Sequence, residues 1–149
     1  VLGRDYGGSS MIDNVNNPKH YTSHPSGVEA IEITRWLRGP YSNACKYVMR
    51  GWEGLKGDPI EDLQKSLWYL NDAEKYPDDG LDLHPALEIK WHEYSEAELC
   101  EEKKECLGEI LIASEIEEHD NPPSSTINAA KKLIQDRIAY LQSRPDVAL

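Results

Sequence analysis

Basic residues are scarce in this chain of 149 residues, which has 16 Lys and Arg against 27 Asp and Glu and a formal net charge of -11. Affinity for nucleic-acid backbones comes largely from Lys and Arg side chains that neutralise phosphates. The composition therefore excludes a general nucleic-acid binder. The excess of acidic over basic residues is unevenly distributed. Residues 1–76 carry 9 basic and 10 acidic side chains, whereas residues 77–149 carry 7 basic and 17 acidic ones. We expect the two halves to have different roles.

Long apolar runs and cysteines are also few. No run reaches the length that a membrane span requires, and the N-terminus lacks the basic-then-apolar layout of a secretory signal. Cys45, Cys100 and Cys106 are odd in number and lack the spacing of a metal site. This pattern predicts free thiols in a soluble, cytoplasmic protein without a membrane partner. Residues 1–10 are rich in Gly and Ser and precede Met11, so we interpret them as a tag remnant.

No segment alternates apolar and polar β-branched residues as a strand does, and the expected fold class is therefore all-α. Helical spacing and capping residues predict helices over residues 29–37, 42–52, 58–70, 86–118 and 127–142. In this reading Gly39-Pro40 ends the first helix, and residues 51–57 form a glycine-rich loop. We expect a small helical domain over residues 11–76 with an extended N-terminal arm, a linker over residues 77–85, and acidic C-terminal helices over residues 86–149.

One face of the predicted 42–52 helix collects four polar side chains. Asn43, Lys46, Tyr47 and Arg50 fall at positions i, i+3, i+4 and i+7. Lys supplies a point charge, Arg a planar fork for two phosphate oxygens, and Asn both donors and acceptors. This set is suited to binding phosphate. A solvated basic helix face is the alternative that the composition leaves open.

The next helix begins at Asp58-Pro59, with a capping carboxylate followed by Pro at the first helical position. Glu61, Asp62 and Lys65 lie within about one turn of each other. Carboxylates here could hold Mg²⁺, which prefers one or two of them together with substrate phosphates. We interpret Glu61 as a capping residue that pairs with Lys65, and Asp62 as the freer metal candidate.

The glycine-rich loop places Lys56 directly before this helix, but it is not a P-loop. It lacks both the Gly-Lys-Ser/Thr ending and the preceding strand that a P-loop needs. Any nucleotide chemistry must therefore use another scaffold.

An acidic pattern in the second half is similar to a known type of metal site. Glu102-x-x-Glu105 and Glu117-x-x-Asp120 resemble the paired motifs of all-α nucleotide pyrophosphohydrolases such as the MazG and dUTPase-like group. In that group the two motifs lie on separate, facing helices. One continuous helix would keep the two clusters roughly 22 Å apart here. We therefore interpret them as an acidic, solvated helix face.

Four blocks of the first half, in order, resemble a family of small bacteriophage proteins described as nucleotide kinases. The family pattern runs N-x-P-x-H-Y, G-[IV]-E, N-x-x-K-Y-x-x-R and E-D-L-x-K-A-x-W-Y-L. The corresponding blocks are Asn16 to Thr22, Gly27 to Ile31, Asn43 to Arg50 and Glu61 to Leu70. Two departures are visible: residues 51–56 keep one Lys of a usually basic cluster and add Glu53, and Ser66 replaces the usual Ala.

The resemblance implies a kinase that transfers a phosphoryl group from ATP, with Mg²⁺, to a (deoxy)nucleoside monophosphate. It assigns catalysis to Lys46, Arg50 and Lys65, and metal binding to Glu61 and Asp62. It assigns nucleotide binding to Asn17, His20, Tyr21, Glu29, Asn43, Tyr47, Lys56 and Tyr69. It also implies a location in the cytoplasm of an infected bacterial host.

Two other functions remain open from the sequence. One is a non-catalytic nucleotide-binding or inhibitory protein whose acidic half docks an unknown protein, and the other is an all-α nucleotide pyrophosphohydrolase. The helices of the first half are short and each has one apolar stripe, so residues 11–76 alone would be marginally stable. We therefore expect them to pack against the C-terminal helices or to self-associate as a homo-oligomer.

Overall fold

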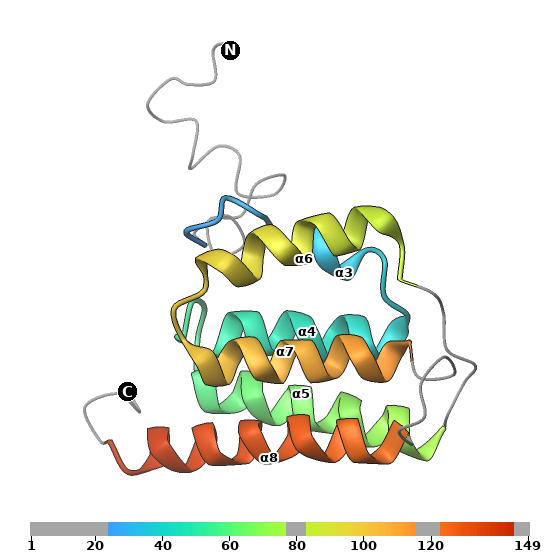
Figure 1. The fold of residues 1–149 in the computed structure, drawn as a ribbon. Helices are drawn as coiled ribbons and strands as arrows, with labels where there is room; N and C mark the ends of the chain where they lie inside the picture. The colour runs from blue at the N-terminus through green and yellow to red at the C-terminus, as the bar shows by residue number, and fades with distance from the viewer. Residues whose placement is uncertain (1–23, 77–82, 116–122, 145–149) are drawn as a thin grey trace.

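The computed structural model describes residues 24–76, 83–115 and 123–144, which form six α-helices and no strand (Figure 1). The all-α prediction is confirmed. The helices are α3 (Ala30–Thr34), α4 (Gly39–Gly51), α5 (Pro59–Lys75), α6 (Pro85–Ala97), α7 (Glu101–Ser114) and α8 (Pro123–Gln142). Residues 1–10, most of the predicted arm and most of the predicted linker lie outside the described residues. Within the described part, no helix combines the length and the apolar character of a membrane span.

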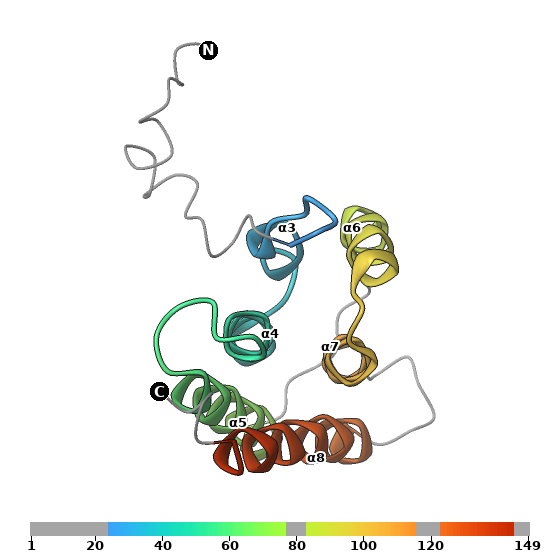
Figure 2. The same cartoon turned by 90° about the vertical axis from the view of Figure 1, so that its left-hand side faces the viewer.

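The helices form two columns that face each other (Figure 2). The first column contains α3, α4 and α5, and the second contains α6, α7 and α8. Each helix of the first column packs against its counterpart in the second, as α3 with α6, α4 with α7 and α5 with α8. The hydrophobic core lies between the columns and includes Trp52, Leu63, Leu107 and Ile134. Of the two expected alternatives, packing against the C-terminal helices and self-association, the structure shows the first.

Helices α4 and α5 approach each other closely at Gly51. A Cβ atom at this position would lie 2.9 Å from Cβ of Asp62 and 3.1 Å from the carbonyl oxygen of Pro59, which is too close for any side chain. The loop that joins the helices turns with positive φ at Gly54 and Gly57. The packing of α5 onto α4 therefore depends on Gly51 having no side chain.

The predicted break at Gly39-Pro40 is wrong, because these residues begin α4. Helix α3 ends at Thr34, and Arg38 is the N-cap of α4. Pro is tolerated in the first turn of a helix, where its missing N–H would have no intrahelical partner. The Gly-Pro pair thus starts a helix here, whereas the sequence interpretation took it as a stop.

The predicted long helix over residues 86–118 is also wrong, because it is divided into α6 and α7. Glu98 adopts an extended conformation with φ -79° and ψ 121°, and its carboxylate accepts a hydrogen bond of 3.0 Å from the N–H of Cys100. Leu99, next to the break, is 90% exposed. Cys106, Ile110 and Ala113, which lie on α7 at helical spacing, are buried.

The other helix predictions are closer to the structure. Asp58 caps α5 by accepting a hydrogen bond of 2.9 Å from the N–H of Ile60. Helix α8 begins at Pro123, four residues before its predicted start. Its apolar residues at helical spacing form a stripe that is buried at Ile127, Ala130, Ile134 and Leu141 and partly buried at Ile138.

The cysteines provide a test of this core. All three are free thiols, as predicted. Cys45 and Cys106 are buried, and burial raises the pKa of Cys45 to about 12 and the pKa of Cys106 well above its ordinary value, whereas Cys100 is half-buried. Because the thiolate is the reactive form, a thiol reagent should label one cysteine of the native protein, Cys100, and all three after denaturation. Peptide mass spectrometry measures the sites, and native labelling of Cys45 as fast as Cys100 would contradict the fold.

Candidate functional site

Three cations gather around the ring of Tyr47. Nζ of Lys46 lies 4.8 Å from the ring centroid, Cζ of Arg50 lies 5.1 Å from it, and Nζ of Lys65 lies 5.5 Å from it. The ring of Tyr69 lies parallel to that of Tyr47, with 6.0 Å between the centroids. We call these five residues the basic face.

The basic face combines two helices. Lys46, Tyr47 and Arg50 share a side of α4 because Lys46 and Arg50 are four residues apart. Lys65 and Tyr69, also four residues apart, lie on α5, which packs against α4. The structure therefore brings together the three residues to which the resemblance assigns catalysis.

Two carboxylates accompany the cations. Nη2 of Arg50 lies 3.5 Å from Oδ1 of Asp62, and Nζ of Lys65 lies 3.1 Å from Oε2 of Glu61. Burial raises the pKa of Asp62, an effect that Arg50 partly offsets, and the hydrogen bond to Glu61 raises the pKa of Lys65. Lys46 has no carboxylate partner in the described part of the chain. The basic face thus keeps a surplus of positive charge.

Glu61 and Asp62 point in different directions. Consecutive helical residues project about 100° apart. The side chain of Asp62 is 5% exposed and faces α4, whereas that of Glu61 is 62% exposed and pairs with Lys65. Oδ2 of Asp62 and Nε of Arg50 are buried and lack a hydrogen-bond partner among the described residues. In the same part of the chain, no three or more His, Cys, Asp or Glu side chains are grouped as a metal site would need.

The remaining predicted residues lie elsewhere. Asn43 donates a hydrogen bond of 3.2 Å to the carbonyl of Gly39, one turn before Tyr47. Glu29 is the N-cap of α3, and Lys56 is exposed on the loop after α4. Asn17, His20 and Tyr21 lie outside the described residues.

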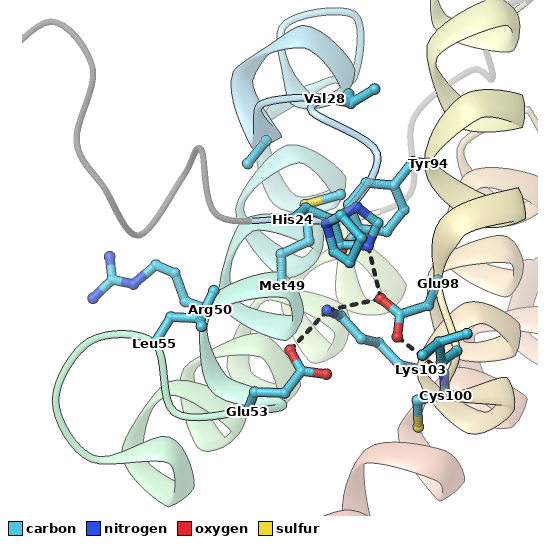
Figure 3. Close-up of a pocket in the computed structure, with 13 residues that line it drawn as sticks. His24, Val28, Met49, Arg50, Glu53, Leu55, Tyr94, Glu98, Cys100 and Lys103 are labelled. Atoms are coloured by element: carbon cyan, nitrogen blue, oxygen red, sulfur yellow. Dashed lines mark hydrogen bonds and ion pairs between the residues drawn. The ribbon is translucent and has the colours of Figure 1, made fainter.

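A cavity of about 380 Å³ lies between the two columns of helices (Figure 3). It is lined from both halves of the chain, and most of its walls are apolar. The lining residues are His24, Pro25, Val28, Ala30, Met49, Arg50, Glu53, Leu55, Tyr94, Glu98, Leu99, Cys100 and Lys103.

A network of charged side chains around the buried Lys103 forms one wall of the cavity, which we call the charged wall. The side chain of Lys103 is 2% exposed, and its Nζ donates to Oε1 of Glu53 at 2.9 Å and lies 3.0 Å from Oε1 of Glu98. Nε2 of His24 also lies 3.0 Å from Oε1 of Glu98, and the His24 ring stacks on Tyr94 with 3.6 Å between centroids. Because a buried charge without a partner is strongly destabilising, this network holds the two halves together.

The pKa shifts fit this arrangement. Burial lowers the pKa of His24, although the hydrogen bond to Glu98 opposes the shift. Nδ1 of His24 accepts a hydrogen bond of 3.2 Å from the N–H of Ser26, so the neutral ring carries its proton on Nε2 and donates it to Glu98. Burial acts to raise the pKa of Glu98, but the hydrogen bonds from Cys100 and Lys103 outweigh it and the pKa is lowered.

The sequence interpretation did not identify Glu53, Tyr94, Glu98 or Lys103 as site residues. One signal was present for Lys103, which lies three residues before Cys106 and four before Leu107, on the side of α7 that is buried. A lysine on an apolar stripe indicates a buried partner. No comparable signal exists for Glu98, because its position depends on the break between α6 and α7.

Acid should weaken the fold in two steps. The pKa of His24 is lower in the folded protein than the ordinary 6.5, so the unfolded chain binds this proton first and the free energy of unfolding decreases as the pH falls below about 6.5. Glu98 adds a second loss below about 4.5 for the same reason. Urea denaturation across this range measures both. His24→Gln should remove the first step, and the exposed control His92→Gln should retain it; an unchanged profile in His24→Gln would refute this assignment.

Comparisons with known proteins identify one related segment. Residues 15–71 match the model of a family described as a protein of unknown function, DUF3310. No curated protein and no solved structure matches the chain. The matched segment includes α3, α4 and α5 as far as residue 71. The second half, which supplies Tyr94, Glu98 and Lys103, lies beyond it. The similarity to this family is thus confined to the first half of the chain.

Proposed function

We propose that this protein binds a nucleotide with its phosphates on the basic face, and that it transfers a phosphoryl group from ATP to a (deoxy)nucleoside monophosphate. The observation that carries the proposal is the convergence of Lys46, Arg50 and Lys65 on one aromatic ring. The transfer itself draws on the resemblance to the phage nucleotide kinases.

The convergence favours an anionic ligand. Each cation lies within 5.5 Å of the same ring centroid, so no two of them are more than 11 Å apart. Like charges at such distances repel each other. The tyrosine ring contributes only about 0.5–1 kcal/mol per exposed cation. Asp62 and Glu61 neutralise two of the three charges. A phosphate group would balance the remaining charge and would supply acceptors for all three donors.

The residue types suit phosphoryl transfer. This reaction depends mostly on positioning and on neutralising developing charge, and it needs no covalent catalyst. Lys46 and Lys65 would approach the phosphates from different helices, and Arg50 would hold two oxygens through its planar fork. The ring of Tyr47, which all three cations approach, would orient them, and Tyr69 lies parallel to that ring.

Among the described residues around the basic face, the Mg²⁺ that accompanies ATP would have one accessible carboxylate. Asp62 is buried against Arg50, whereas Glu61 is 62% exposed at the edge of the basic face. Mg²⁺ is commonly held by one or two carboxylates together with substrate phosphates, and its chemical contribution is to neutralise phosphate charge. Glu61 is therefore the residue that fits this role.

Removal of one cation should weaken nucleotide binding. Lys46→Ala is the cleanest variant because Lys46 has no carboxylate partner among the described residues. We expect the Kd for ATP, measured by calorimetry, to rise about tenfold or more, since a hydrogen bond to a charged group contributes about 1.5–3 kcal/mol. Arg50→Ala should have at least the same effect. Lys132→Ala, which removes an exposed lysine paired with Asp136 on α8, is the control. An unchanged Kd in Lys46→Ala and Arg50→Ala would refute the basic face as the binding site.

Product analysis separates the possible reactions. With ATP, Mg²⁺ and a panel of deoxynucleoside monophosphates, we expect deoxynucleoside diphosphates and ADP to accumulate. Release of pyrophosphate and a monophosphate from a triphosphate would show the hydrolase reaction instead. Binding without any product would show that the protein is a nucleotide-binding protein without turnover and would refute the kinase reaction.

A further inference from the structure

Arg50 connects the basic face with the cavity. Its guanidinium group lies over the Tyr47 ring, and the residue also lines the cavity. Figure 3 shows this guanidinium pointing away from the His24, Glu98 and Lys103 side chains. A ligand whose phosphates contact Arg50 therefore lies at the edge of the cavity.

The cavity has the character of a small-molecule site. Its volume of about 380 Å³ falls within the range of about 300–1,000 Å³ that ligand pockets occupy. Its walls include the apolar side chains of Val28, Met49 and Leu55, and its charged groups are those of the charged wall together with Arg50 at the edge. Leu55 is 40% exposed and Leu99 is 90% exposed, so the cavity opens to the surface.

The charges of the cavity determine which part of a nucleotide it can accept. Glu53 and Glu98 carry two negative charges against the single positive charge of Lys103, and His24 is neutral. The charged wall therefore has a net charge of one negative unit and repels phosphate. The uncharged base is the part that would enter, while the phosphates remain at Arg50.

One oxygen of the charged wall, Oε2 of Glu53, can accept a hydrogen bond from a ligand. Lys103 interacts with Glu53, Glu98 and Tyr94, and both oxygens of Glu98 accept hydrogen bonds. Oε1 of Glu53 is bonded to Lys103, but its Oε2 has no hydrogen bond from the described residues, and the side chain is 43% exposed. An ionised carboxylate only accepts hydrogen bonds, so Glu53 would recognise an N–H donor.

We propose that the cavity binds the base of the nucleotide, that Glu53 accepts a hydrogen bond from an N–H donor of that base, and that the second half of the chain thereby forms part of the site. This inference rests on the proposed function, which places the phosphates on the basic face. According to this inference, the second half of the chain, which lies beyond the family match, forms one wall of the nucleotide site.

Filling the cavity tests the inference without altering the basic face. Leu55→Trp enlarges a half-exposed side chain at the cavity wall, and Ile112→Trp makes a similar change on α7 at a residue that is 39% exposed and does not line the cavity. Tripolyphosphate serves as a probe of the phosphate site alone, and dCMP as a probe of both parts. Calorimetry should show that Leu55→Trp weakens dCMP binding at least tenfold and leaves tripolyphosphate binding unchanged, whereas Ile112→Trp affects neither.

The outcomes separate the two proposals. If Lys46→Ala weakens binding of both probes but Leu55→Trp leaves dCMP binding unchanged, the proposed function stands and the cavity inference is wrong. If neither probe binds the wild-type protein, both are wrong.

Alkylation of Cys100, which lines the cavity, gives a second test. In the wild-type protein, dCMP should slow this alkylation and tripolyphosphate should not. Equal alkylation rates with and without bound dCMP would overturn the inference even if Leu55→Trp failed to fold.

The role of Glu53 has its own test. Glu53→Gln retains an oxygen for Lys103 but loses the charge, so it should weaken dCMP binding about tenfold, because a hydrogen bond to a charged group contributes about that factor. Tripolyphosphate binding should stay unchanged. Unchanged dCMP binding by Glu53→Gln would overturn the role of Glu53.

Discussion

The buried ammonium group of Lys103 is the interaction on which the arrangement of this molecule depends. It lies at the junction of three segments, since Glu53 follows α4, Glu98 separates α6 from α7, and Lys103 belongs to α7. A buried charge that loses its partner costs several kcal/mol. The two columns of helices must therefore meet in a register that brings both carboxylates to Lys103, and this register also places His24 against Tyr94 and creates the cavity.

The two halves divide the chemistry between them. The excess of negative charge belongs to the second half, yet the part of that half which faces the cavity contributes a lysine, a tyrosine and one carboxylate. The first half, which is nearly neutral, places three of its cations on the side of α4 and α5 that carries Tyr47. A strongly acidic chain can therefore present a basic face, because the position of the charges and not their sum determines what binds.

Capping residues and apolar spacing in the sequence predicted the helices whose ends and buried sides depend on neighbouring residues in the chain. Asp58 caps α5, and the stripe of α8 is buried as its spacing indicates. The prediction was wrong at Gly39-Pro40, because Gly and Pro can end a helix or occupy its first turn, and only the tertiary packing of α3 and α4 decides between them. It was wrong again at Glu98 and Leu99, where no Gly or Pro marks the break. There the hydrogen bonds of Glu98 to Cys100, Lys103 and His24 stabilise the extended backbone.

The sequence by itself determined the all-α class and the shared face of Lys46, Tyr47 and Arg50, because helical periodicity is a property of neighbouring residues. Only the tertiary structure decided that Lys65 joins them, since this requires α5 to pack on α4 at a glycine without a side chain. The tertiary structure alone also decided that Glu53 and Glu98 meet Lys103. Glu53 and Lys103 are 50 residues apart in the chain. Such contacts depend on the packing of distant segments, and spacing along a chain carries no direct information about them.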